Sequence, residues 1–101
     1  MANNISPTDL QNKKNEYVIL DVRESSELYE GKIDGAITIP LGLLIKKVRH
    51  EDMNEYKDKK IVTFCNGGYR GNIAADELNK QGFNAINLEG GYNAWKESKN
   101  K

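Results

Sequence analysis

The sequence has one cysteine, one histidine and one tryptophan among its 101 residues. A single cysteine excludes an intramolecular disulfide and a metal site built from several thiolates, and it leaves no second thiol for disulfide exchange. Lys plus Arg and Asp plus Glu both number 15, so the formal net charge is zero. This balance gives no electrostatic reason to expect nucleic acid or an anionic membrane surface as a partner.

Long apolar segments are also missing. The longest nearly apolar run, residues 36–45, is interrupted by Thr38, Pro40 and Gly42 and is too short to span a bilayer. Residues 1–15 are polar and lack the apolar centre of a secretory signal. We therefore expect a single domain over residues 1–101, without a membrane partner. Its expected location is the reducing cytoplasm, where a lone thiol can persist for chemistry.

Short apolar runs alternate with segments of helical spacing along the chain. Such runs are typical of strands that are covered on both faces, and they occupy residues 17–20, 36–39, 61–64 and 84–88. Helical segments are expected near residues 7–14, 25–30, 41–48 and 72–81 and after Gly91. The alternation predicts an α/β fold with a mainly parallel central sheet of about five strands, flanked by helices.

The only cysteine stands at the end of one expected strand. Cys65 is followed by the glycine-rich loop 66–69, then by Arg70 and a helical segment. Glycines let loop N–H groups turn inward, and a helix N-terminus favours negative charge. Arg70 adds a permanent cation near the same loop. These features favour a reactive thiolate at Cys65 over an inert core cysteine.

A lone thiolate in such a loop supports two chemistries. It can attack sulfur and become a persulfide, or it can attack phosphorus or arsenic. A papain-like hydrolase would need a histidine base, and His50 lies in a charged segment that we expect at the surface. In both remaining reactions the loop amides stabilise an anion, so residue types alone do not separate them. The size of the loop separates the two reactions, because a larger tetrahedral anion needs a wider ring of amides.

Charged residues follow the strand expected at residues 17–20. Asp21, Arg23 and Glu24 lie where open α/β sheets place their sites, beyond the carboxyl ends of the strands. An ion pair that fixes a loop is the favoured interpretation for Arg23 and Glu24. Asp21 is either scaffold or a support for the active loop. We predict that Asp21 and Arg23 surround the site, and that Trp95 anchors the core.

Over about residues 17–97 the sequence resembles the rhodanese family of sulfurtransferases in its single-domain form. Four motifs occur in the family's order, at residues 20–24, 31–36 with 39–40, 65–70, and 88–91 followed by Trp95. Lys32 stands where a histidine is common in the family. Four residues separate Cys65 from Arg70, as in rhodaneses, whereas dual-specificity phosphatases and arsenate reductases have five. Gly71 lacks the hydroxyl that often follows the arginine in those enzymes.

The resemblance implies a sulfurtransferase without a cofactor or a metal. Cys65 would attack the outer sulfur of a donor such as thiosulfate, release sulfite and carry a persulfide until cyanide or a thiol removes the sulfur. Amides of the active loop would bind this persulfide; the loop residues are Asn66, Gly67, Gly68, Tyr69 and Arg70. Arg70 either guides anionic donors or braces the loop. A second implied role is a sulfur-relay module that hands the persulfide sulfur to a partner protein, and the sequence does not rank the two roles.

Overall fold

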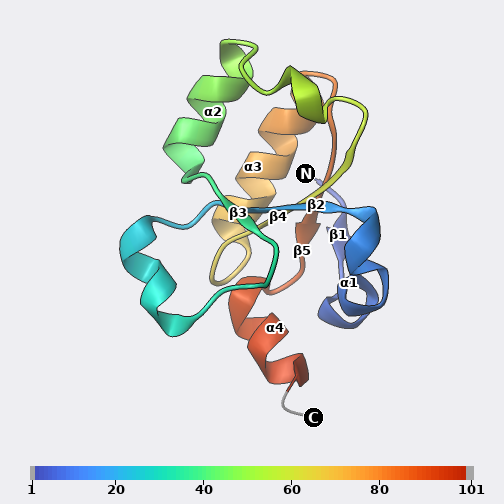
Figure 1. Cartoon of the computed structure of the whole chain (residues 1–101), viewed down its shortest axis with the longest axis vertical. Coiled ribbons are helices and arrows are strands. Elements are labelled where there is room, and N and C mark those ends of the chain that lie inside the picture. Colours follow the sequence, from blue (N-terminus) through green and yellow to red (C-terminus); the bar gives the residue numbers. More distant parts are fainter. Residues whose placement is uncertain (1, 100–101) are drawn as a thin grey trace.

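The computed structural model describes residues 2–99, which fold around one parallel five-stranded sheet in the order β1-β5-β4-β2-β3 (Figure 1). The strands are β1 (Asn4–Ile5), β2 (Val18–Asp21), β3 (Ile37–Thr38), β4 (Lys60–Phe64) and β5 (Asn84–Leu88). Every pairing is parallel, and β4 lies between β2 and β5. The predicted α/β class with a mainly parallel sheet of about five strands is confirmed.

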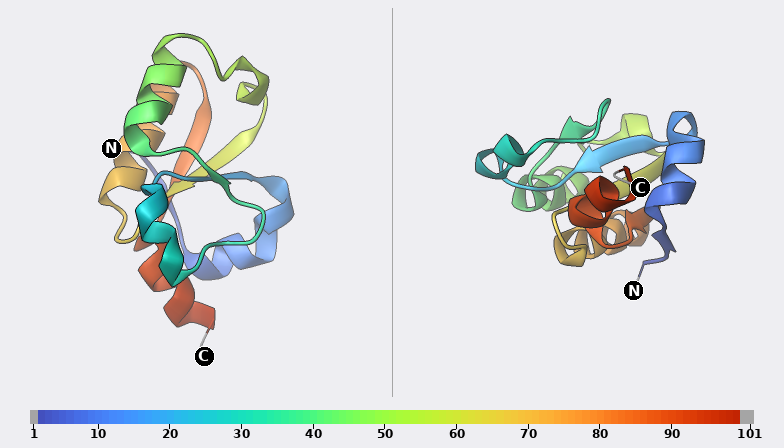
Figure 2. Two further views of the ribbon diagram at one scale, coloured as in Figure 1. Left: turned by 60° about the vertical axis from the view of Figure 1, so that its left-hand side comes forward. Right: turned by 90° about the horizontal axis from the view of Figure 1, so that it is seen from below.

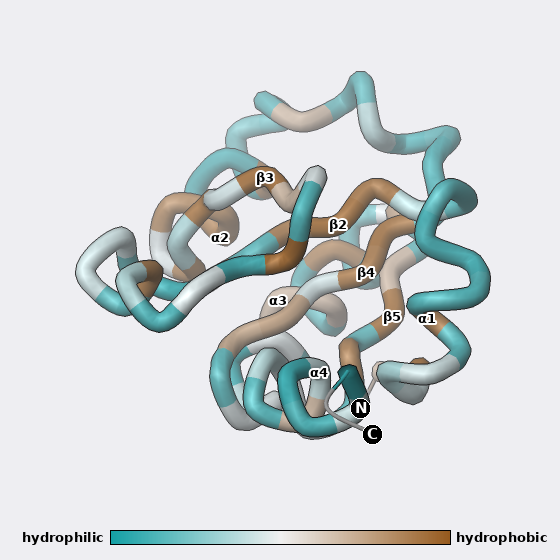
Figure 3. Tube along the Cα trace, turned by 60° about the horizontal axis from the view of Figure 1, so that its bottom comes forward, coloured by the Kyte–Doolittle hydropathy of each residue, from teal (hydrophilic) through white to brown (hydrophobic). Residues whose placement is uncertain are grey.

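Helices cover both faces of this sheet, as the views in Figure 2 show. The α-helices are α1 (Pro7–Lys13), α2 (Leu41–Arg49), α3 (Tyr69–Lys80) and α4 (Gly91–Lys99). Short 3-10 helices are η1 (Lys14–Glu16), η2 (Ser25–Glu30) and η3 (Asn54–Tyr56). Residues of α2 and α3 share one buried apolar cluster, and residues of α1 and α4 share the other. Strands covered in this way are apolar on both faces, which explains the continuous apolar runs (Figure 3).

Several local predictions hold. The side chain of Ser6 caps α1 by accepting from the N–H of Asp9 at 3.1 Å, and Pro7 takes the first helical position. Trp95 is 5% exposed and belongs to the core, whereas His50 is exposed. None of the helices within residues 2–99 combines the length and the apolar composition needed to cross a membrane.

Two boundaries near the sheet edge differ from the prediction. Strand β1 was not expected, because two residues are too few to show a strand pattern. Helix α3 begins at Tyr69, three residues before the expected start at residue 72. Gly68 precedes it with a φ of 110°, in the left-handed region that glycine adopts without strain. The early start places Arg70 in the first turn of α3.

Candidate active site

Cys65 directly follows β4 at the carboxyl end of the sheet, where parallel α/β folds place their sites. The N–H of Gly68 donates to its Sγ at 3.1 Å, and the cysteine is only 2% exposed. The first turn of helix α4 binds the start of the loop. The N–H of Tyr92 donates to the carbonyl of Cys65 at 2.8 Å, and the N–H of Asn93 donates to the carbonyl of Asn66 at 3.0 Å. The thiol therefore sits at the start of a loop whose first two carbonyl groups are fixed by α4.

Gly91 explains why α4 can approach the loop so closely. A β-carbon at this position would collide with the carbonyl oxygens of Cys65 and Asn66, and the residue has a φ of 63°. Only glycine combines this conformation with this proximity at no steric cost. The motif at residues 88–91 thus supports the active loop directly. The sequence did not indicate this role, because the motif lies about 25 residues after Cys65.

Arg70 is bound by a carboxylate that the sequence did not single out. Its Nη1 and Nη2 atoms each donate to a carboxylate oxygen of Glu27 at 2.7 Å, which is the fork geometry typical of strong Arg–carboxylate pairs. The hydrogen bond with Arg70 lowers the pKa of Glu27 from 4.5 to about 2, and the N–H of Glu24 contributes in the same direction. The same pairing raises the pKa of Arg70, and Cys65 adds a smaller effect of the same sign. The guanidinium therefore lies within reach of the sulfur while it is held by Glu27.

The second arginine, Arg23, is fully buried beneath the loop. Its Nε and Nη2 atoms donate to Asp21 at 3.0 and 2.8 Å, and Nη2 also donates to the carbonyl of Gly31 at 2.9 Å. The guanidinium lies over the ring of Tyr92 with 4.6 Å to its centroid. Its remaining nitrogen, Nη1, donates to Oδ1 of Asn66 at 3.1 Å. Arg23 thus pairs with Asp21 and supports the loop through Asn66. The side chain of Glu24, for which an ion pair was also expected, instead belongs to the capping box of η2.

Asn66 joins the two ion pairs. Its Oδ1 accepts from Arg23, and its Nδ2 donates to Glu27 at 3.0 Å. The structure therefore links Asp21, Arg23 and Asn66 to the loop that carries Cys65 and Arg70, and it adds Glu27. Nothing in the sequence pairs residue 27 with residue 70. The one available signal is local, since Glu27 stands three residues after Glu24 and closes a capping box at the start of η2.

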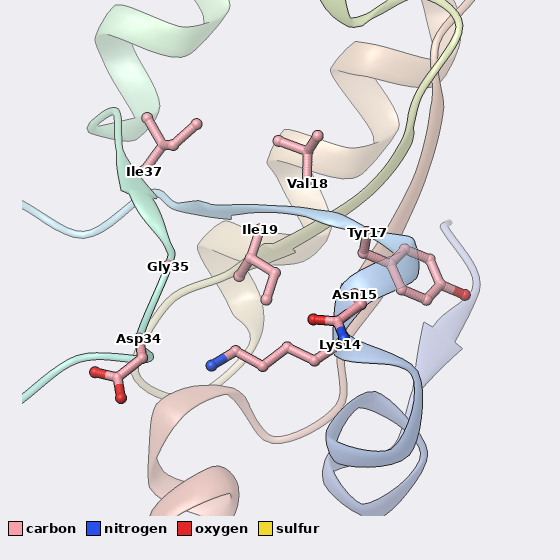
Figure 4. Close-up of a pocket in the computed structure, with 8 residues that line it drawn as sticks. All are labelled: Lys14, Asn15, Tyr17, Val18, Ile19, Asp34, Gly35 and Ile37. Atoms are coloured by element: carbon pink, nitrogen blue, oxygen red, sulfur yellow. The ribbon is translucent and has the colours of Figure 1, made fainter.

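Tyr69 takes a different position from the rest of the loop. Its side chain is 80% exposed, at the rim of the site. A small hollow beside the loop is lined by Asn4, Gly67, Gly68, Tyr69, Asn72, Asn87, Glu89 and Gly90. A different hollow, drawn in Figure 4, is lined by residues around β2 and β3, none of which belongs to the active loop. The hollow at the loop thus includes Gly67, Gly68 and Tyr69 of the active loop, but Cys65 is not one of its lining residues.

The chain is similar to several known proteins over most of its length. The family model described as "Rhodanese-like domain" matches residues 6–98. The chain is 39% identical over 80 residues to the putative sulfurtransferase YtwF of Bacillus subtilis, covering 79% of this chain and 74% of that protein. It is 40% identical over 78 residues to the putative sulfur carrier protein YrkF of the same organism, covering 76% of this chain but only 40% of that protein.

A solved structure shows the same architecture. The crystal structure of a rhodanese-related protein from Thermoplasma volcanium superposes with a TM-score of 0.82 at 34% identity, over 95% of this chain and 92% of that one. The residues that the family model matches, 6–98, include β4, the loop and α3, which carry Cys65 and Arg70. This chain belongs to the rhodanese-like domain family.

Proposed function

We propose that this chain is a sulfurtransferase that carries sulfane sulfur as a persulfide on Cys65. The observation that carries the proposal is the position of Sγ, which accepts an N–H bond from Gly68 at the carboxyl end of β4 and the start of α3. Backbone amides fixed in this way stabilise a negative charge at the sulfur without reorganising during the reaction. The name of YtwF, a putative sulfurtransferase, supports the same reaction class. The proposal assumes the reducing cytoplasm, in which a lone thiol stays available.

The reaction has two halves. The Cys65 thiolate attacks the outer sulfur of thiosulfate, a new S–S bond forms, and the bond between the donor's two sulfurs breaks with its electron pair leaving on sulfite. Cyanide or a thiolate then attacks the terminal sulfur of the persulfide, and Cys65 leaves again as the thiolate. The loop residues 66–70 hold the sulfur during both steps, and the Gly68 N–H donates to Sγ. This mechanism needs neither a metal nor a cofactor.

Intact mass spectrometry tests the first half-reaction. The protein is incubated with thiosulfate, separated from excess reagent and weighed with and without a reducing agent. We expect a gain of one sulfur atom that cyanide removes with release of thiocyanate. The Cys65→Ser variant should gain nothing. A protein that stays unmodified at high thiosulfate and also with an organic persulfide would refute the proposal.

A sulfur-relay module is the second candidate, and the similarity to YrkF, a putative sulfur carrier protein, favours it. In this role Cys65 passes its sulfur to a cysteine of a partner protein. The relay predicts slow discharge with small acceptors and fast discharge with one specific protein. Loading the chain with labelled sulfur and following transfer to cell proteins by mass spectrometry separates the two candidates.

The ion pair between Arg70 and Glu27 argues against phosphatase or arsenate reductase chemistry. An enzyme of this kind needs the arginine fork to bind two oxygens of its tetrahedral substrate. Here both terminal nitrogens of Arg70 are engaged by Glu27. The loop also has four residues between Cys65 and Arg70, which makes a narrow ring of amides. Turnover of an aryl phosphate that disappears in Cys65→Ser would reverse this conclusion.

A further inference from the structure

The two arginines that contact the Cys65 loop are each paired with a carboxylate in the described structure. Arg23 pairs with Asp21 and Arg70 pairs with Glu27, so the four side chains together carry no net charge. An anion that approaches Cys65 therefore meets the dipoles of the loop amides, while the charges of both arginines are already compensated. Thiosulfate carries two negative charges, one of which sits on the sulfonate directly beside the sulfur that reacts.

The two pairs differ in their access to reactants. Asp21 and Arg23 have side-chain exposures of 1% and 0%, so their charges are fixed inside the protein. Glu27 and Arg70 are 26% and 32% exposed. The second pair thus lies at the protein surface, within reach of both the thiol and an arriving reactant. Glu27 is held there by Arg70, by Asn66 and by the backbone N–H of Glu24.

We propose that Glu27 sets the charge preference of the Cys65 site by neutralising Arg70. This rests on the sulfur-transfer function proposed above and adds a donor class to it: organic persulfides, R–S–SH, in preference to thiosulfate. In that transfer the Cys65 thiolate attacks the terminal sulfur, the bond between the donor's two sulfurs breaks, and RS⁻ leaves with the electron pair. The leaving sulfur is bonded to carbon and carries no sulfonate, so the donor needs no cation beside the loop. Glu27 is a positioning and specificity residue and does not touch the reacting atoms.

Alkylation of Cys65 measures this preference without any sulfur transfer. Iodoacetate and iodoacetamide both form an S–CH₂ bond with the thiolate and release iodide, but only iodoacetate carries a charge. The ratio of their rates cancels any change in the amount of thiolate. In Glu27→Gln, we expect the ratio of iodoacetate to iodoacetamide rates to rise about three- to tenfold at about 0.01 M salt and to fall toward the wild-type value at about 1 M.

Two further variants make the experiment decisive. Arg70→Gln leaves Glu27 unpaired, so the ratio should move in the opposite direction. Glu77→Gln removes a carboxylate that pairs with Arg49 on α2, away from the loop, and should leave the ratio unchanged. If Glu27 served only to keep the loop folded, both rates would change together and the ratio would stay at the wild-type value, which would overturn the proposal. If Glu27→Gln does not fold, an unchanged ratio in Arg70→Gln overturns it equally.

The donor experiment separates this proposal from the function on which it rests. Wild-type protein should load sulfur faster from an alkyl persulfide than from thiosulfate, and Glu27→Gln should lower the KM for thiosulfate while the KM for the alkyl persulfide changes little. Equal effects on both donors would overturn the charge role. Absence of loading from either donor, together with the expected alkylation ratios, would instead refute the sulfurtransferase and leave the charge role of Glu27 standing.

Discussion

Replacing Asp21 by asparagine removes the charge that compensates a fully buried guanidinium. Arg23 has no exposed side-chain area and donates to Asp21 through both Nε and Nη2. Taking away one partner of a buried ion pair leaves an uncompensated charge and typically costs about 3–5 kcal/mol. Such a loss is a large part of the roughly 5–15 kcal/mol that stabilises a typical domain. For a chain of this size we expect the melting temperature to fall by roughly 15–30 °C.

Urea unfolding followed by far-UV circular dichroism measures this effect. The midpoint should fall while the slope stays the same, because the variant exposes the same surface on unfolding. Asp52→Asn is the matched control: Asp52 pairs with Lys47 at 3.2 Å but is 69% exposed, so its loss should cost less than about 1 kcal/mol. The double variant Asp21→Asn/Arg23→Met should be less destabilised than the sum of its single variants, since it leaves no buried charge.

Equal midpoints for Asp21→Asn and Asp52→Asn would refute the reasoning. That result would mean that water reaches Arg23, or that Gly31 and Asn66 satisfy it without a counter-charge. A midpoint that falls as expected, with additive single variants, would show instead that Asp21 acts through its hydrogen bonds to the backbone N–H and side chain of residue 23 and not through its charge.

The remaining predictions concern α4, the loop and acid stability. Trp95→Ala should lower the free energy of unfolding by about 3–5 kcal/mol, measured in urea, because it empties a buried site. Gly91→Ala should lower the free energy of unfolding by about 1–3 kcal/mol and also slow sulfur loading of Cys65, since the new methyl group displaces the carbonyls of Cys65 and Asn66. A normal loading rate would show that the close approach of residue 91 to these carbonyls does not position the loop. The pKa of Glu27 falls from 4.5 to about 2, so its stabilisation is complete above about pH 4.5 and is lost as the pH falls toward 2. The difference in unfolding free energy between wild type and Glu27→Gln should therefore shrink over that range, and a constant difference would argue against an ionic Glu27–Arg70 pair.

The sequence predicted much of the architecture because its signals are local. The strand at Asn84–Leu88 and the helix that starts at Pro7 follow from apolar runs and a capping residue that lie next to each other in the chain. Cys65 stands out for the same reason, as the end of an apolar run before three closely spaced glycines. Strand β1 gave no such signal, since its two residues form a strand only by pairing with β5 at the far end of the chain.

The sequence did not predict which charged side chains bind one another in the site. Glu27 meets Arg70 across 43 positions, and Asn66 meets Arg23 across the same separation. Any of the 15 acidic residues could have paired with Arg70 as far as the sequence is concerned. The choice was made by the parallel order of β2 and β4, which brings the segments after both strands to one edge of the sheet.

The sequence alone thus determined that a single thiol ends a buried strand, that a glycine loop and an arginine follow it, and that this arrangement resembles rhodaneses. These are properties of consecutive residues, and short-range sterics and hydrophobic patterning suffice to express them. Only the tertiary structure decided what the arginine does: Glu27, delivered by η2, binds both of its terminal nitrogens. The sequence showed a glycine loop with a cation, Arg70, and the structure shows that Glu27 already neutralises this cation. The sequence could not reveal this pairing, because charge compensation depends on distances that are set by tertiary packing.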